Sequence, residues 1–452
     1  MREQKPQYIR EQTMKFRRGR IGRRAFISSM LSAGVTVPTA MGMASQVIAE
    51  TPQPGGTLRL ALAQASSLNN LDPARALDGF SAQAAFLYGN ALTEIAPDGA
   101  LRGDLATGFE DLGNGQSWMF DLRPGVSFHS GKSLTATDVI ASFSRLRDLP
   151  RPPAVMRLIS GMRAEDPARI RIDLYAALPS FARELADPRF IILPEKDGSL
   201  DPAAGIGTGP YQLQGFAPLD GLKATRWSNY HHSDRAYFEQ CELCAVPDTN
   251  TRLGALLNDE ADAIDQVEPG MAALLDRAPN ISVQTVPGSV AQIVAFAQGT
   301  PANFRDAVSL GLDRDAMVES LVLGRGFVGS DKALPTAEFP AGDVPALTIS
   351  AFGAAGVSAT AKAVCDAARQ NGIPAELTNG PASATDAVAL QMPTGASDLQ
   401  MSDATGGRTE LLVPILAHAL NGLSGRLHTP RVIADNANLD GFKAPERWWF
   451  AA

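Results

Sequence analysis

Residues 118 to 146 constrain the fold more than any other stretch, because they predict a strand, a turn and a helix in direct succession. Large apolar residues occupy every second position from Trp118 to Leu122, which is the period of a β-strand. Pro124-Gly125 then favours a turn, since proline presets φ at the first central position and glycine accepts a positive φ at the next. Thr135 and Asp138 have the spacing of a capping box, so a helix with one buried face is expected to begin there.

The same stretch contains a glycine-rich segment, Gly125 to Ser133, that superficially looks like a phosphate-binding loop. That motif has four residues between its glycines, whereas Gly125 and Gly131 are separated by five. The loop binds phosphate through consecutive backbone amides, so one extra residue would redirect every donor. We therefore do not expect nucleotide binding here.

Charge is distributed unevenly along the 452 residues, and this bears on partners. Residues 1–50 carry nine Lys/Arg and three Asp/Glu, whereas the rest of the chain carries 31 and 45. An acidic body argues against nucleic-acid binding, because neutralising phosphates requires a basic surface. The length exceeds what one hydrophobic core usually covers and predicts two or three domains.

The basic N-terminus, residues 1–49, has the features of a twin-arginine-type export signal. Arg23-Arg24 is followed by one variable residue and the apolar pair Phe26-Ile27, and residues 25–49 carry no charge. The alternative is an uncleaved membrane anchor, since this run is long enough to span a bilayer. Its many Ser, Thr, Gly and Pro residues make it weakly apolar and favour cleavage. We expect a periplasmic protein.

Residues 123–146, RPGVSFHSGKSLTATDVIASFSRL, resemble the signature of the family 5 extracellular solute-binding proteins, the peptide, nickel and opine receptors of bacterial ABC importers. In that family an LRPGVKFHDG segment leads into FTAEDV and a helix. Five further stretches match in the family's order: 55–59 with 71–73, 87–99 with 105–106, 207–211, 246–256, and 307–314.

The resemblance implies an α/β, two-lobed periplasmic binding protein-like fold, type II and cluster C-like, with an inserted small α/β subdomain. The family's later motifs have no clear counterpart after about residue 330, so a shortened second lobe is expected. The expected division is 1–49 for the signal segment, 50–93 with 205–297 and 425–452 for lobe I, 94–204 for the inserted subdomain, and 298–424 for lobe II.

The resemblance also places a loop and the start of a helix beside the ligand. The candidate substrate-binding residues there are Leu77, Asp78, Gly79 and Phe80. Asp78 equally suits the alternative of a helix cap with one apolar staple. If these residues bind ligand, alanine at Asp78 and Phe80 should weaken binding and leave melting nearly unchanged.

Phe296 and Gln298, at the end of a buried strand near the expected hinge, are two further candidates for ligand contacts.

Two motifs suggest metal or redox chemistry, and each has a simpler explanation. Cys241 and Cys244 have CxxC spacing but lie on a predicted strand, where residues three apart point to opposite faces. His231 and His232 are adjacent, and adjacent side chains seldom aim at one ion. No third ligand stands at a helical or hairpin spacing, so a solvated loop is favoured. We expect no metal and no cofactor.

Several other elements are predicted from periodicity and local signals. The expected strands include 57–61, 169–174, 190–193, 222–227, 237–246, 291–298, 347–352, 375–378, 387–391 and 431–433. The expected helices include 80–92, 179–185, 248–257, 269–275, 304–312, 314–323, 357–370 and 411–420.

The function implied by the resemblance is that of an exported substrate-binding protein of an ABC importer, and not of an enzyme. Its partners would be a small-molecule or short-peptide ligand and a transporter permease, with membrane contact only through the permease or an uncleaved signal. No Gly-x-Ser-x-Gly, His-Glu-x-x-His or Ser-x-x-Lys motif occurs. An exported hydrolase, or a binding or scaffold protein not coupled to a transporter, remain the alternatives.

Overall fold

The computed structural model describes most of the chain after residue 53. The described residues are 54–63, 70–76, 78–96, 99–218, 220–296, 308–329, 347–351, 355–370, 372–378, 387–393, 410–428 and 448–450, with 8–9, 12, 23–33, 35, 52, 300 and 306.

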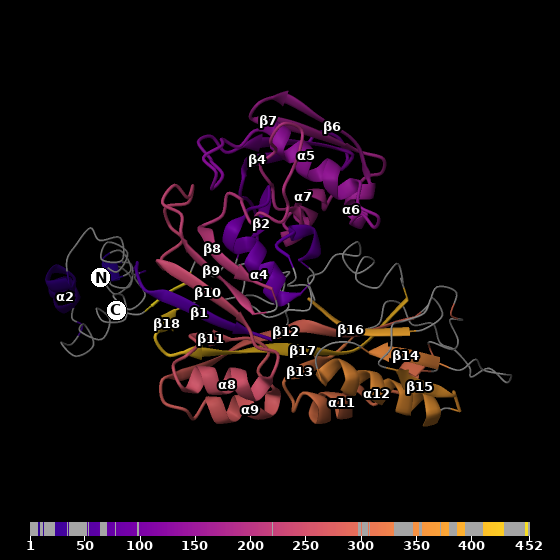
Figure 1. The fold of residues 1–452 in the computed structure, drawn as a ribbon. Coiled ribbons are helices and arrows are strands. Elements are labelled where there is room, and N and C mark those ends of the chain that lie inside the picture. The colour runs from indigo at the N-terminus through magenta and orange to yellow at the C-terminus, as the bar shows by residue number, and fades with distance from the viewer. Residues whose placement is uncertain are drawn as a thin grey trace.

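A large mixed sheet of 11 strands extends along the lower part of the molecule in Figure 1. Its strands are β1 (Thr57–Leu62), β8 (Tyr211–Ala217), β9 (Gly221–Arg226), β10 (Gln240–Ala245), β11 (Ala263–Ile264), β12 (Ile281–Phe296), β13 (Gly326–Val328), β14 (Leu347–Ala351), β15 (Ala375–Thr378), β16 (Ala387–Pro393) and β17 (Glu410–Ser424). The order is β15-β14-β16-β12-β17-β11-β1-β10-β9-β8, and β13 also pairs with β17.

The two long strands β12 and β17 form an antiparallel ribbon that joins the two ends of this sheet. Near Ile281, β17 also pairs with β11, whereas near Phe296 the ribbon lies beside β16. The register of the pairing between β12 and β17 shifts between Val286 and Val290. Such a shift interrupts the ladder and bends the strand that carries it.

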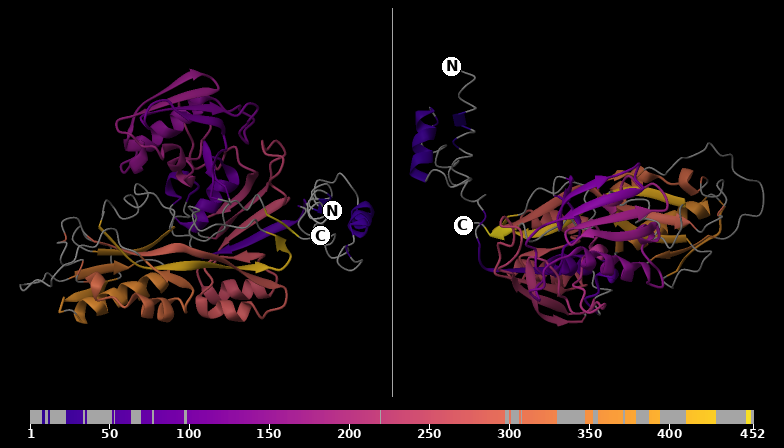
Figure 2. Two further views of the ribbon diagram at one scale, coloured as in Figure 1. Left: turned by 180° about the vertical axis from the view of Figure 1, so that it is seen from behind. Right: turned by 90° about the horizontal axis from the view of Figure 1, so that it is seen from above.

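A second sheet, ordered β4-β5-β7-β6, stands apart from the first (Figure 2). Its strands are β4 (Ala106–Asp111), β5 (Ser117–Leu122), β6 (Ile159–Asp166) and β7 (Arg169–Leu174). Trp118, Phe120 and Leu122 are buried at every second position, as their alternation predicts. One buried apolar cluster contains side chains of this sheet and of the segments around it, from Leu92 to Ile192. We call residues 92–192 the small-sheet unit.

The helix predicted after Thr135 is α5 (Ala136–Arg147), and the expected capping box is present. The Asp138 carboxylate accepts a hydrogen bond from the Thr135 backbone amide at 2.9 Å. Val139, Phe143 and Leu146 are buried against the small sheet. This unit also contains the hairpin of β2 (Thr93–Ile95) with β3 (Leu101–Gly103), and the short helices α6 (Ala154–Arg157) and α7 (Phe181–Glu184).

Helices cover both faces of the large sheet. Those on one face are α8 (Thr249–Leu257), α9 (Pro269–Leu275), α11 (Arg314–Leu321) and α12 (Ala355–Gln370), whereas α4 (Gly79–Tyr88) lies on the opposite face, below the small sheet (Figures 1 and 2). The helix predicted over 80–92 ends at Tyr88, where the chain becomes extended at Gly89. Among the described residues, including the short N-terminal helix α2 (Arg23–Ser32), no helix has the length and apolarity needed to cross a membrane.

Two predicted elements are wrong. Residues 411–420 were predicted to be helical, but they belong to β17, whose backbone bonds pair with β12. A continuous apolar run fits either structure, and Pro414 opposes a helix interior. Residues 190–193, predicted to be a strand, begin in the short helix η2 (Pro188–Phe190) and continue without a ladder partner. Their burial reflects packing and isolated bonds, such as that from the Ile192 amide to the Asn90 carbonyl.

The other predicted helices and strands are either found in the structure or lie partly or wholly outside the described residues. The predicted strand containing Cys241 and Cys244 is β10, and its alternation buries Cys241 and exposes Cys244. Of the predicted helix 304–312, residues 306 and 308–310 are helical and residues 304, 305 and 307 lie outside the described residues, as does all of the predicted strand 431–433. The chain end nevertheless returns to the large sheet, because Trp448 is fully buried in the cluster that contains Leu58 and Tyr211.

Candidate functional site

The candidate site begins at the carboxyl ends of three neighbouring strands. β1 runs parallel to β10 and to β11, so Leu62, Ala245 and Ile264 end at the same edge of the sheet. Ligands of open α/β sheets bind outside this edge. The chain leaves β1 at Ala63, whose amide donates to Asp265 Oδ1 at 2.7 Å.

Arg252 of α8 anchors the same edge from below. Its side chain is buried, and Nη1 donates to the carbonyls of Val246 and Pro247, each at 2.8 Å. Burial lowers the pKa of Arg252, although the charge of Asp265 opposes this effect. These bonds satisfy two carbonyls that follow the end of β10.

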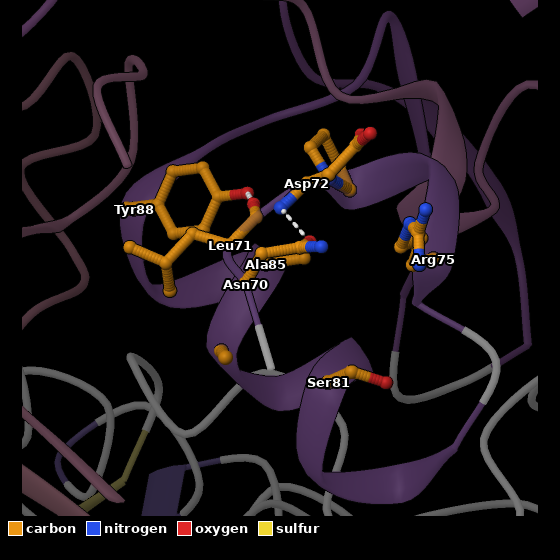
Figure 3. Close-up of a pocket in the computed structure, with 9 residues that line it drawn as sticks. Asn70, Leu71, Asp72, Arg75, Ser81, Ala85 and Tyr88 are labelled. Carbon is orange, nitrogen blue, oxygen red and sulfur yellow. Dashed lines mark hydrogen bonds between the residues drawn. The ribbon is translucent and has the colours of Figure 1, made fainter. Parts of the chain in front are cut away.

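Beyond β1 the chain forms a small pocket against α4 (Figure 3). Its lining comes from residues 70–76, which we call the pocket loop, and from α4. It is a shallow hollow that opens to solvent. The lining residues are Asn70, Leu71, Asp72, Pro73, Arg75, Ser81, Ala84, Ala85 and Tyr88.

Hydrogen bonds fix one wall of the pocket. The Tyr88 hydroxyl donates to the Leu71 carbonyl at 2.5 Å, and the Asp72 amide donates to Asn70 Oδ1 at 2.9 Å (Figure 3). Burial raises the pKa of Tyr88, so the phenol stays protonated and keeps its donor. The Asp72 carboxylate forms an ion pair with Arg145 of α5, which ties the pocket loop to the small-sheet unit.

The helix start beside the pocket is capped by its own residues. Asp78 Oδ1 accepts from the Ser81 amide at 2.8 Å and from the Ser81 hydroxyl at 2.7 Å. The Asp78 amide donates back to Ser81 Oγ at 3.2 Å, which completes a capping box. This reciprocal pair explains why α4 begins at Gly79.

Arg75 supplies the exposed cation of the pocket. It stands across the pocket from Tyr88 (Figure 3). Among the residues that the structure describes, no carboxylate forms a salt bridge with its guanidinium. A planar guanidinium in this position suits a carboxylate, which it can bind through two parallel hydrogen bonds.

The predicted ligand residues are scattered over the described structure. Asp78 is 7% exposed and serves as the cap of α4, and Phe80 is fully buried in the cluster around Leu58. Phe296 ends β12 and is buried in a different cluster, so the structure does not bring it against Phe80. Leu77 and Gln298 lie outside the described residues. A role in ligand binding therefore remains a prediction for these positions.

The prediction of a solvated loop at the histidine pair is wrong. The side chains of His231 and His232 are only 5% and 13% exposed. Their Nε2 atoms lie 3.3 and 2.9 Å from the same oxygen, Oδ1 of Asp104. Asp104 is more than 120 residues away in sequence, so no local spacing indicated the contact.

Burial and hydrogen bonding set the charge of this cluster. Burial alone would raise the pKa of Asp104, but hydrogen bonds from His231 and His232 and the charge of Arg235 lower it overall. Burial lowers the pKa of His231, and the nearby Asp104 carboxylate compensates only in part. A neutral His231 imidazole beside an ionised Asp104 carboxylate is therefore the expected state at neutral pH.

Sequence reasoning missed the polar lining of the pocket. The prediction for residues 77–80 lay next to it but included neither Arg75 nor Ser81. Asp72-Pro73 offered a signal for Arg75, since an aspartate before proline favours a tight helical start, and Arg75 ends the 3₁₀ turn that follows.

Comparison with known proteins identifies the family. Residues 100–376 match the family model described as bacterial extracellular solute-binding proteins, family 5 Middle. The chain belongs to this family. The resemblance drawn from the sequence motifs is therefore confirmed, and the members of this family are solute-binding proteins rather than enzymes.

Curated relatives include the glutathione-binding protein GsiB of Salmonella typhi, which is 26% identical over 297 residues. That alignment covers 63% of this chain and 57% of GsiB, so the chain matches a little over half the length of this relative.

Solved structures share the fold. The periplasmic binding protein AgaA of A. tumefaciens R10, in complex with agropinic acid, has a TM-score of 0.72 at 18% identity. DppA of Helicobacter pylori, in complex with the peptide STSA, has a TM-score of 0.73 at 15% identity. The alignments cover 88% and 89% of this chain and 99% of each of the others. They confirm the expected two-lobed periplasmic binding protein fold.

Proposed function

We propose that this protein is an exported substrate-binding protein of an ABC importer, which traps a peptide-like or other small solute between two lobes and presents it to a permease. The single observation that carries the proposal is the family match over residues 100–376. In proteins of this kind, a ligand that contacts both lobes favours the closed form and shifts the population toward it.

The proposed hinge is the ribbon of β12 and β17. Lobe I would comprise residues 50–93, 205–297 and 425–452, the inserted subdomain 94–204, and lobe II the shortened segment 298–424. The register shift between Val286 and Val290 supports this assignment, because it interrupts the strand ladder between the end paired with β11 and the end paired with β16. Hinges are short segments that absorb the change in backbone angles.

We infer that the ligand contacts the pocket beside α4. Arg75 would bind a carboxylate of the solute, and Ser81 would supply a hydroxyl. The residues that the sequence predicts to contact the ligand are Leu77, Asp78, Gly79, Phe80, Phe296 and Gln298. A peptide-like ligand is supported by the likeness to a glutathione-binding protein and to a protein solved with a peptide.

Export to the periplasm is part of the proposal. Arg23-Arg24 and the apolar pair that follows support the twin-arginine route, and the many Ser, Thr, Gly and Pro residues of the uncharged run up to Ala49 favour cleavage. Contact with the membrane would then come only through the permease.

The test is mass spectrometry of small molecules released from the mature protein after purification under native conditions. A peptide or other solute at near one molecule per chain, released by denaturation and rebound by the emptied protein, is the expected result. Turnover of that solute on incubation would instead indicate an exported hydrolase. Absence of a ligand, together with no response to peptide mixtures, would favour a scaffold without transport.

A further inference from the structure

The cluster of Asp104, His231 and His232 is independent of the pocket and of the proposed hinge. Asp104 lies between β3 and β4 of the small-sheet unit, whereas the histidines lie in the loop between β9 and β10 of the large sheet. Each residue offers one ligand atom, and these atoms lie within 4.8 Å of one another. We propose that the three residues bind a divalent transition-metal ion such as Zn²⁺, which clamps this loop onto the small-sheet unit.

The donor set fits such an ion. Two imidazole nitrogens and one carboxylate oxygen are ligands that Zn²⁺ accepts, and three protein ligands leave a fourth position for water. With bonds of about 2.0 to 2.1 Å, ligand atoms at tetrahedral positions lie about 3.3 to 3.4 Å apart. The His231 Nε2 to Asp104 Oδ1 distance of 3.3 Å already matches, and the His232 distance of 2.9 Å requires only a small opening.

Surrounding groups hold the carboxylate in place. Asp104 Oδ2 accepts from Asn90 Nδ2 at 2.9 Å, which leaves Oδ1 facing the histidines. The Asp104 backbone is fixed on both sides, because its amide donates to the Leu92 carbonyl and its carbonyl accepts from Arg123 Nε at 2.9 Å. Outer partners of this kind orient the ligands of metal sites.

Positive charge near the three residues would lower their affinity for a metal cation. Arg235 contributes, but Glu94 pairs with both of its terminal nitrogens, at 2.6 and 2.9 Å, and offsets that charge. Imidazole ligands favour Zn²⁺, Ni²⁺ and Cu²⁺, whereas Mg²⁺ prefers an all-oxygen shell. We therefore expect Zn²⁺ to bind and Mg²⁺ not to bind.

The experiment titrates Zn²⁺ into the mature chain, with any affinity tag removed and prior metal stripped by EDTA, and follows the heat of binding. We expect one Zn²⁺ per chain, a higher melting temperature with Zn²⁺, and no saturable heat with Mg²⁺. Co²⁺ should give visible absorption bands of a low-coordinate site. His232→Gln keeps a hydrogen-bond donor but supplies no imidazole, and it should weaken Zn²⁺ binding at least tenfold.

The double variant His231→Ala/His232→Ala should lose the binding entirely, and Asp121→Asn, which removes an exposed carboxylate of the same unit, should leave it unchanged. Absence of saturable Zn²⁺ binding by the unaltered protein overturns the proposal. Binding of unchanged affinity in His232→Gln overturns it as well, even if the double variant fails to fold.

Discussion

The small-sheet unit and the pocket loop lie side by side and are built in different ways. The small-sheet unit contains one apolar cluster of 23 buried residues, counted over the described part of the chain, packed between one sheet and short helices. The pocket loop is held by individual polar contacts, such as Tyr88 to Leu71 and Asp72 to Arg145, and leaves Arg75 exposed. We therefore expect substitutions in the small-sheet unit to lower the free energy of unfolding, and substitutions in the pocket loop to lower the affinity for the solute.

The largest effect is expected from Phe120→Ala in the small-sheet unit. Phe120 is fully buried and its ring lies 6.2 to 6.4 Å from those of Phe109, Trp118 and Phe181. Its loss should cost roughly 3 to 5 kcal/mol of unfolding free energy, measured by urea denaturation. The affinity of the folded protein for its solute should stay unchanged.

Phe109→Ala is the matched control, because Phe109 is only partly buried against the same cluster. Equal losses of unfolding free energy in Phe120→Ala and Phe109→Ala would mean that the two rings are equally buried, contrary to the structure.

Phe80→Ala examines the boundary between the two regions. From the sequence, alanine at Asp78 and Phe80 was expected to leave melting nearly unchanged, but Phe80 is fully buried and Asp78 caps α4. We now expect Phe80→Ala to cost about 3 kcal/mol or more and Asp78→Ala about 1 kcal/mol, both by thermal and urea unfolding. A stable Phe80→Ala variant with weakened binding would restore the original expectation.

Arg75→Ala should produce the converse pattern. Losing a charge-assisted contact to a carboxylate should weaken solute binding about tenfold or more, as followed by titration calorimetry with the solute identified by mass spectrometry. Stability should change by less than about 0.5 kcal/mol, since Arg75 is exposed.

Arg147→Ala, another exposed arginine but on α5, should alter neither binding nor stability. Unchanged affinity in Arg75→Ala would remove this pocket from the proposed site.

The smallest effect concerns pH. His129 is buried, its Nε2 lies 3.0 Å from the Gly209 carbonyl, and burial lowers its pKa below the usual value. The unfolded chain therefore binds this proton more readily, so His129 should reduce stability as the pH falls below about 6.5. Urea denaturation of the wild type and of His129→Asn at pH 7.5 and 5.5 should give a smaller pH-dependent loss in the variant.

If the wild type and His129→Asn lost the same unfolding free energy between pH 7.5 and 5.5, His129 would take up its proton equally well in the folded and unfolded chains, contrary to its burial.

Local sequence signals predicted local structure well. The alternation at 118–122 and the capping box at Thr135 were found as expected, because both depend on neighbours in sequence. The apolar run of β17 was misassigned, because its partner β12 lies more than 100 residues earlier and only that pairing decides between strand and helix. The family motifs predicted the fold, since they combine many positions along the chain.

The candidate site was less predictable. The predicted residues 77–80 lie beside the pocket, but Arg75 and Ser81 became distinguishable only once the pocket loop was seen against the helix. The burial of His231 and His232 could not be inferred, because Asp104 reaches them from another sheet. The histidine cluster depends on a contact between segments that are distant in sequence. The pocket, lined by residues 70–88, depends instead on how the pocket loop folds against the helix that follows it.

The most direct test of the central claim is small-angle X-ray scattering of the mature protein with and without its solute. The account predicts that saturating solute reduces the radius of gyration, because the two ends of the large sheet close on it about the β12 and β17 ribbon. A radius of gyration that does not change on saturation, with binding verified in the same sample, would contradict trapping by hinge closure.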